Sequence, residues 1–172
     1  KVPPGIIRPS MDRMRESVFA TLGDLCGASF LDIFSGTGIV ALEAASRGAA
    51  YIEAVEMDVK KRGILIKNVS ISPVRIHCHF MAAELYVLRA KRDFDYIFCD
   101  PPFPYRYKWD LVRGIARSPL ARDGTLILLH RPREDFHDQE IAFIQKDTPR
   151  EYGRSIVEFL RVRKDKETLE KL

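Results

Sequence analysis

The chain has few long hydrophobic runs and no cysteine pattern. None of its apolar stretches approaches the roughly 18–20 residues that a membrane-spanning helix needs, so we expect no membrane association. The opening KVPPGIIRPS lacks the apolar centre of a signal peptide. The three cysteines, Cys26, Cys78 and Cys99, form an odd set without paired spacing. This argues against a disulfide framework and predicts a reducing, cytoplasmic location.

The chain also lacks a large excess of positive or negative charge. Lysine and arginine number 28 against 24 aspartates and glutamates, a net charge of +4. This mild excess permits a polyanionic partner but does not require one. The length of 172 residues suits one domain with a full core. We predict a single domain, with an N-terminal segment and helix at 1–28, a core at 29–163 and a charged tail at 164–172.

Strand-like and helix-like segments alternate along the chain. We predict a first helix over 11–25, N-capped by Ser10. Strands are predicted at 30–34, 51–56, 74–80, 94–99 and 125–130, with helices at 38–47, 58–68, 82–90 and 109–117 between them. Two late strands, 141–146 and 155–162, flank a turn around 149–153. The alternation predicts a doubly wound, mostly parallel α/β sheet, and the late strands predict an antiparallel hairpin at one edge.

A glycine-rich turn joins the first core strand to the next helix. The segment LDIFSGTGIVALEA places Gly36 and Gly38 where backbone N–H groups can approach a ligand closely. Glu56 ends the next strand and can accept both hydroxyls of a ribose. A glycine-rich turn alone occurs in many α/β proteins, so Glu56 is what favours a nucleoside site. Ala41 completes a G-x-G-x-x-A pattern, but Asp32 inside the strand suits the ammonium of a methionyl group, which favours S-adenosylmethionine over NAD.

The fourth strand ends in YIFCDPPFPYRY. Asp100 follows the strand, and Pro101 and Pro102 remove two N–H donors from the next backbone. Such a site offers acceptors and suits a group with two N–H donors, such as the exocyclic amine of a purine. Accepting those hydrogens frees the nitrogen lone pair for attack on a methyl sulfonium, and Phe103 offers a face for base stacking. The plainer interpretation is a turn that ends a strand.

These motifs resemble a known family. DPPF with LDIFSGTG resembles the class I amino-methyltransferases. The segment IRPSMDRMRESVFATL, together with ALEAASRGA and the late Tyr152-Gly153 pair, resembles the bacterial 16S ribosomal RNA guanine-N2 methyltransferases of the small-subunit methyltransferase D type. The resemblance covers about residues 7–161. It implies a Rossmann-like, seven-stranded sheet, S-adenosylmethionine as methyl donor, and 16S rRNA in a small-subunit or assembly particle as partner of a monomeric enzyme.

The resemblance also implies a set of site residues. Asp100, Pro101, Pro102 and Phe103 would form the catalytic set. The cofactor-binding residues would be Arg8, Ser10, Asp12, Asp32, Phe34, Ser35, Gly36, Gly38, Glu56 and Met57. No metal is expected, because His77 and His79 alternate in one strand without a third ligand at suitable spacing.

Two departures from the family pattern matter. The family usually has a basic, glycine-rich strand pair before the R-P-T segment, and this chain starts at Lys1 without it. The family also tends to place a polar residue after the third strand to bond the adenine amine. Phe80 and Met81 stand there, so we expect packing and backbone groups to select adenine.

Several other residues carry two interpretations. Tyr105, Tyr107 and Trp109, interleaved with Arg106 and Lys108, could clamp RNA or pack the following helix. A separate set could neutralise phosphates or be merely solvated: Arg13, Arg15, Arg131 and Arg133. Cys99 suits the core better than a nucleophilic role.

Two further enzymes and one non-enzyme fit parts of this pattern. A DNA adenine-N6 methyltransferase could share D-P-P-F, although no DNA target-recognition region is visible. A nicotinamide-dependent oxidoreductase is disfavoured by Asp32. A non-catalytic nucleic-acid-binding or assembly module would keep the fold, but the intact Gly36, Gly38, Glu56 and Asp100 argue against it. Binding of adenosylmethionine, measured by calorimetry, discriminates an enzyme from this non-catalytic module.

Overall fold

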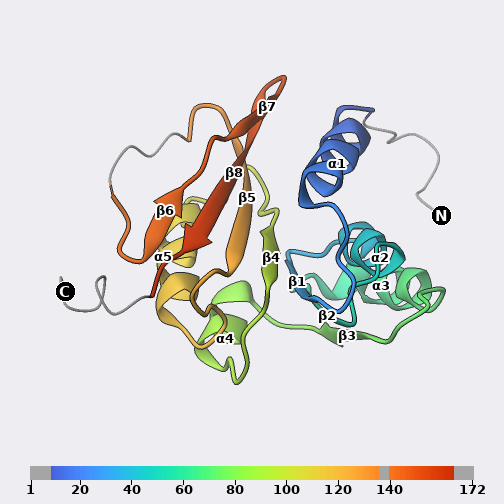
Figure 1. Ribbon diagram of the computed structural model, residues 1–172. Helices are drawn as coiled ribbons and strands as arrows, with labels where there is room; N and C mark the ends of the chain where they lie inside the picture. The colour runs from blue at the N-terminus through green and yellow to red at the C-terminus, as the bar shows by residue number, and fades with distance from the viewer. Residues whose placement is uncertain (1–8, 136–139, 165–172) are drawn as a thin grey trace.

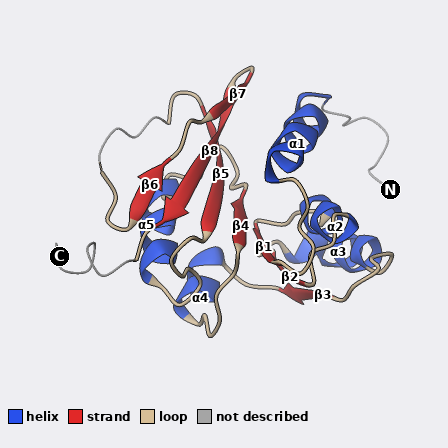
Figure 2. Ribbon diagram, in the orientation of Figure 1, coloured by secondary structure: helices blue, strands red, loops and turns tan. Residues whose placement is uncertain are grey.

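A single sheet with helices on both faces forms the molecule (Figures 1 and 2). The computed structural model describes residues 9–135 and 140–164. Its strands are β1 Ser29–Ile33, β2 Tyr51–Val55, β3 Ile76–His79, β4 Tyr96–Cys99, β5 Leu126–Pro132, β6 Ile144–Lys146, β7 Arg150–Tyr152 and β8 Ser155–Val162. Its helices are α1 Pro9–Leu22, α2 Ile39–Ser46, the short 3₁₀ helix η1 Val59–Lys61, α3 Arg62–Val69, α4 Ala83–Leu88 and α5 Lys108–Arg117. None of these helices is long and apolar enough to cross a membrane.

The sheet is parallel through its first five strands and antiparallel at one edge. Its order is β3-β2-β1-β4-β5-β8-β6, and β7 pairs with β8. Strands β1 to β5 run parallel, whereas β8 runs antiparallel to β5, β6 and β7. The predicted doubly wound fold with an antiparallel edge is therefore confirmed.

The sheet has eight strands instead of seven because the segment around 149–153 contains a strand as well as a turn. Residues Arg150–Tyr152 form β7, which pairs with the first residues of β8, while β6 pairs with its last residues. The reversal itself is confined to Gly153, with φ +60°, and Arg154. A three-residue strand between a proline and a glycine gives no periodic signal, so the sequence pattern indicated only the turn.

The first helix differs from its predicted bounds. It begins at Pro9, so Ser10 lies inside the helix and is not its N-cap. Proline fits a first helical turn because the N–H it lacks has no partner there. The helix ends at Leu22, three residues earlier than predicted, where Gly23 takes a left-handed conformation and its N–H bonds Phe19 O at 2.9 Å.

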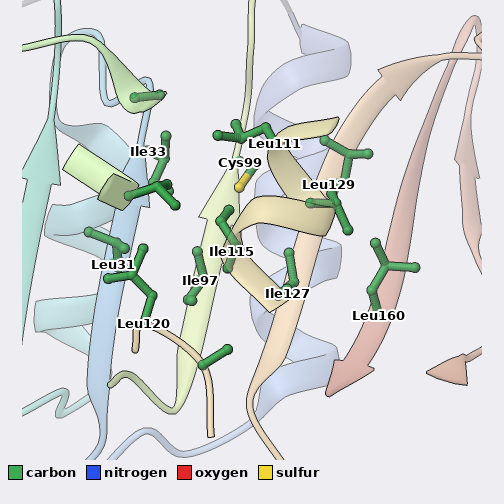
Figure 3. Close-up of a cluster of buried hydrophobic side chains, with 14 of the residues drawn as sticks. Leu31, Ile33, Ile97, Cys99, Leu111, Ile115, Leu120, Ile127, Leu129 and Leu160 are labelled. Atoms are coloured by element: carbon green, nitrogen blue, oxygen red, sulfur yellow. The ribbon is translucent and has the colours of Figure 1, made fainter. Parts of the chain in front are cut away.

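Two hydrophobic cores lie on opposite faces of the sheet. Because side chains alternate along a strand, Phe30 faces α1 and α2, whereas Leu31 and Ile33 face α4 and α5. Figure 3 shows the second core, where Leu111 and Ile115 of α5 pack over the central strands. The two layers hold the strand ends rigidly, which is what a precise site at those ends requires.

The strand order places a topological switch point at β1 and β4, which are paired neighbours in the sheet. The chain leaves β1 towards α2 on one face and leaves β4 towards α5 on the other (Figure 2). In open parallel sheets, ligands bind at such a switch point, outside the carboxyl ends of the strands. Here the Asp100 N–H still bonds Ile33 O at 3.3 Å, so the two diverging loops start side by side.

Candidate active site

A cavity of about 1160 Å³ opens at the carboxyl ends of β1, β2, β4 and β5. Ten of the predicted site residues line it: Asp32, Phe34, Ser35, Gly36, Glu56, Met57, Asp100, Pro101, Pro102 and Phe103. They come from three loops that are distant in sequence but adjacent in the sheet. The glycine turn, the Glu56 segment and the D-P-P-F turn therefore surround one space.

Asp32 is the most deeply buried of the acids that line this cavity. Its side chain is 1% exposed and faces the start of α2, where it accepts hydrogen bonds from Ser35 Oγ at 2.7 Å and from Ala41 N at 3.2 Å. Burial raises the pKa of Asp32 to about 7, and the nearby Asp100 and Glu56 carboxylates act in the same direction. A cationic ligand beside Asp32 would favour the ionised, negatively charged form of this side chain.

Glu56 is held by the backbone of two loops. Its Oε2 accepts from Gly36 N at 2.7 Å, and its Oε1 accepts from Asp58 N at 2.8 Å. Lys61 Nζ lies 3.9 Å from Oε2. Each carboxylate oxygen has further lone pairs, so the side chain is fixed in place while it can still accept from a ligand hydroxyl.

The glycine turn contains a strained residue and a packing glycine. Phe34 has φ +65°, a left-handed conformation that costs a bulky residue energy and is concentrated at functional sites. Gly36, with φ +58°, lines the cavity. Gly38 is not among the lining residues; a Cβ there would lie 2.6 Å from Leu65 and 2.9 Å from Val69. Gly38 thus lets α2 approach α3, whereas Gly36 is the glycine of this pair that borders the cavity.

A buried lysine holds the backbone of the D-P-P-F turn in place. Tyr105 N bonds Pro102 O at 2.8 Å and closes the turn. Lys108, at the start of α5, donates from Nζ to Phe103 O at 2.8 Å and to Tyr105 O, and pairs with Asp135 at 2.6 Å. The ring of Phe103 remains 48% exposed. The turn therefore presents an aromatic face on a fixed backbone.

Among the lining residues that were not predicted as part of the site, three have polar groups with defined partners: Glu84, Tyr105 and His130. Tyr105 packs its ring edge against Phe34 at 5.3 Å and donates its hydroxyl to Glu84 of α4. His130 approaches Asp100 from β5, with 2.7 Å between Nδ1 and Oδ1. The signal for His130 was its position at the end of the predicted fifth strand, beside Asp100 at the end of the fourth. The signal for Tyr105 was its place just after D-P-P-F.

The last three predicted site residues are Arg8, Ser10 and Asp12, and Asp12 is not among the residues that line the cavity. Asp12 pairs with Arg15 at 3.0 Å on α1, while its neighbour Met11 is the residue that lines the cavity. Arg8 lies outside the described residues, and the structure does not describe the side chain of Ser10. After β3, the polar group at the cavity is Glu84, whereas neither Phe80 nor Met81 is among its lining residues.

Several candidates for RNA contact have structural roles instead. Trp109 and Lys108 are buried, so both belong to the packing of α5. Arg131 is 1% exposed and pairs with the buried Glu158, which excludes it from phosphate binding in this conformation. Tyr107 stays 63% exposed.

The two histidines of β3 also have partners. His77 stacks on Tyr51 with 5.0 Å between ring centroids, and His79 pairs with Glu53 at 2.5 Å. Within the described ranges, no group of three or more histidine, cysteine or acidic residues is arranged to hold a metal ion. Cys99 is fully buried among the hydrophobic residues, as predicted.

The groups that line the cavity suit a positively charged nucleoside and, next to it, an amine that donates hydrogen bonds. Asp32 and Asp100 bring acidic groups from two neighbouring strands, and Glu56 offers fixed acceptors to a diol. Gly36 brings backbone close to the same space, and Phe103 provides an aromatic face. These residues fit the amino acid, sulfonium and ribose of S-adenosylmethionine.

Comparisons with known proteins agree with this geometry. The family model described as conserved hypothetical protein 95 matches residues 1–161. Ribosomal RNA small subunit methyltransferase D of Escherichia coli is 35% identical over 134 residues, which span 77% of this chain and 67% of that protein. The tRNA1(Val) (adenine(37)-N6)-methyltransferase of Cytophaga hutchinsonii is 36% identical over 103 residues, covering 59% of this chain and 42% of its own length.

A solved structure extends the likeness to the fold. The Escherichia coli protein yhhF, a candidate methyltransferase, superposes with a TM-score of 0.84 at 25% identity, covering 94% of this chain and 91% of that one. The fold is therefore that of a class I methyltransferase, and the relatives support a methyltransferase enzyme. With residues 1–161 matched, the chain belongs to the conserved hypothetical protein 95 family.

Proposed function

We propose that this chain transfers a methyl group from S-adenosylmethionine to the exocyclic N2 amine of a guanine in 16S rRNA. The observation that carries the proposal is the position of Asp100, beside two prolines and an exposed Phe103, in the cavity that also holds Asp32 and Glu56. The match to ribosomal RNA small subunit methyltransferase D supports the choice of RNA as substrate.

The cofactor would be held by the ends of β1 and β2. Glu56 would accept from the ribose hydroxyls, and Asp32 would face the positively charged methionyl end. Gly36 would let the backbone approach closely. When bound, S-adenosylmethionine supplies an electrophilic methyl group on a sulfonium.

The protein's contribution to the transfer would be orientation and charge. Asp100 and the Pro101 carbonyl would accept the two amine hydrogens, because the Pro102 carbonyl is already bonded to Tyr105 N. Accepting both hydrogens directs the nitrogen lone pair at the methyl group and stabilises the positive charge that develops on nitrogen. Phe103 would stack on the base and exclude water from one face.

A second candidate is methylation of an adenine N6 amine in RNA. One observation favours it: the Cytophaga hutchinsonii relative bears an adenine-N6 name and matches at a similar identity, 36% against 35%, although over 103 residues instead of 134. An adenine amine presents the same two hydrogens to Asp100. The two candidates therefore differ in the base and not in the chemistry of the acceptor.

The test is to identify the methylated nucleoside. Purified protein is incubated with methyl-labelled cofactor and, separately, with small-subunit particles, free 16S rRNA, tRNA and unmethylated DNA. Each product is digested to nucleosides. Labelled N2-methylguanosine from small-subunit rRNA is the expected result.

Two other outcomes would decide against the primary proposal. Labelled N6-methyladenosine from RNA would establish the second candidate, and label in DNA would overturn both. Loss of labelling in Asp100→Ala, with Glu43→Gln on the outer side of α2 as the matched control, ties the reaction to this cavity.

A further inference from the structure

His130 is the closest described side-chain partner of Asp100. The parallel register pairs Cys99 with Leu129, so the next residue of each strand lies beside the other. His130 Nδ1 is 2.7 Å from Asp100 Oδ1. The His130 side chain is 1% exposed, whereas that of Asp100 is 27% exposed. The pair thus consists of a buried, packed ring and a carboxylate that opens to the cavity.

The other nitrogen of His130 determines how the pair is protonated. Within the described chain, Nε2 is buried without a hydrogen-bond partner. A proton on Nε2 would be a buried donor with no acceptor, which is costly. A carboxylate oxygen is an acceptor, so the proton belongs on Nδ1. The arrangement fits a neutral histidine that donates from Nδ1 to Asp100.

We propose that His130 is a positioning residue for the acceptor amine, acting through Asp100; this rests on the proposed function. By holding Oδ1, His130 fixes the carboxylate plane and leaves the second oxygen for the amine. Because the histidine is neutral, it orients Asp100 without cancelling its negative charge. That charge stabilises the amine as it becomes cationic.

The transfer that this pair would assist is balanced without a further reactant. A bond forms between the amine nitrogen and the methyl carbon, and the carbon–sulfur bond breaks with its electron pair staying on sulfur. The nitrogen then loses one proton to solvent. His130 supplies no electrons and keeps its proton throughout, so its effect is on geometry and not on stoichiometry.

Two substitutions separate the hydrogen bond from the bulk of the ring. His130→Phe keeps the ring volume and removes the donor. His130→Asn retains an N–H donor close to the place of Nδ1. We expect His130→Phe to lower the single-turnover methylation rate by about 10- to 100-fold, taking as the scale the loss of a partner that orients a metal-binding side chain.

The same variants should bind adenosylmethionine and RNA about as tightly as the wild type. The dissociation constant of adenosylmethionine and the KM for RNA should each change by less than about threefold, since His130 acts on the transfer step. His130→Asn should recover most of the rate. His77→Phe, which removes a histidine stacked on Tyr51, is the control and should be near wild type. Equal losses in the phenylalanine and asparagine forms would overturn the proposal.

A double-mutant cycle tests whether His130 works through Asp100. In an Asp100→Ala background, His130→Phe should cost less than about twofold, because the partner it positions is gone. A full further loss would show that His130 acts independently and would overturn the inference.

A final readout does not depend on activity. Imidazole proton–nitrogen spectra of the wild-type protein should show the proton of His130 on Nδ1, and this signature should change in Asp100→Ala. A proton on Nε2 in the wild type would overturn the inference even if the enzyme is active. Failure of the wild type to methylate any RNA would instead overturn the proposed function and leave the tautomer measurement to decide on the pair.

Discussion

Three acids of one cavity differ in their surroundings. Asp32 is buried and accepts two short-range hydrogen bonds, Glu56 is clamped by two backbone N–H groups, and Asp100 is the most open of the three. These surroundings match the separate roles that we propose for the three carboxylates: meeting a cation, holding a diol and accepting from an amine. Two predictions follow at the scale of single residues.

The first concerns Glu56. If its oxygens accept from the ribose hydroxyls, Glu56→Ala should weaken adenosylmethionine binding by roughly 1.5–3 kcal/mol, the scale of a charge-assisted hydrogen bond. RNA affinity should change much less. Titration calorimetry measures both, with Glu43→Gln as a control away from the cavity. An unchanged cofactor dissociation constant would remove Glu56 from the ribose site.

The second concerns the pH dependence set by Asp32. Burial raises its pKa to about 7, above the ordinary value of 3.8, so the folded chain binds this proton more tightly than the unfolded chain. The stability that the proton contributes is therefore full below pH 3.8 and is lost as the pH rises through 7. A bound cation favours the ionised form and lowers this pKa.

Cofactor affinity should consequently rise between pH 6 and pH 8, around the pKa of about 7. Binding near pH 6.5 should release a proton from Asp32. Calorimetry in two buffers of different ionisation enthalpy counts that proton, and Asp32→Asn should abolish both effects. Proton uptake on binding, or an unchanged profile in the asparagine form, would contradict this role of Asp32.

At the scale of elements, the turn from β1 to α2 both borders the cavity and sets how closely α2 packs against α3. Gly36 borders the cavity, whereas Gly38, two residues later, lies against Leu65 and Val69 of α3. The sequence pattern predicted both glycines, but it assigned both to the ligand. The difference could not be predicted because it depends on how α2 and α3 meet, which no local motif encodes.

Gly38→Ala should therefore destabilise the fold by about 1–3 kcal/mol, through its left-handed conformation and its overlap with Leu65 and Val69. The control is Gly63→Ala in α3, where a Cβ meets nothing within 4 Å and better helix propensity should stabilise slightly. Urea unfolding compares the two. A neutral Gly38→Ala would mean that the helices are not tightly apposed there.

How much of the site was predictable depends on strand order. Asp32, Glu56 and Asp100 follow from the rule that parallel strands end at one edge, and the structure brings them together as expected. His130 was overlooked as a site residue because its contact with Asp100 depends on the register of β5 against β4. Lys108 was ambiguous, since alternating aromatic and basic residues suit a nucleic-acid surface and a helix start equally.

At the scale of the whole molecule, the net charge of +4 coexists with an acidic cavity. Arg13 of α1 and Arg106, just after Tyr105, are exposed cations close in sequence to residues that line the cavity, and we expect them to contact phosphates. We expect the phosphate backbone to bind around the rim and only the target base to enter. Affinity for RNA would then depend on salt.

Binding to 16S rRNA fragments should weaken steeply with ionic strength, with a log–log slope reflecting several phosphate contacts. Arg13→Gln and Arg106→Gln should each reduce that slope by about 0.7, the value for one contact to a single strand. Arg117→Gln, at the far end of α5, serves as a charge-matched control. Binding that ignores salt would rule out a phosphate-dominated footprint.

The central claim is that Asp100 accepts the amine hydrogens during methyl transfer, and one measurement tests it most directly. Single-turnover methylation of small-subunit particles is compared in wild type, Asp100→Asn and Asp100→Ala. We predict near-normal adenosylmethionine binding in all three, because the cofactor would sit mainly on β1 and β2. The transfer rate should fall by about 10²-fold or more in Asp100→Ala, the scale of one preorganised electrostatic contact, with Asp100→Asn in between. Transfer by Asp100→Ala at the wild-type rate would contradict the account and reduce D-P-P-F to a turn.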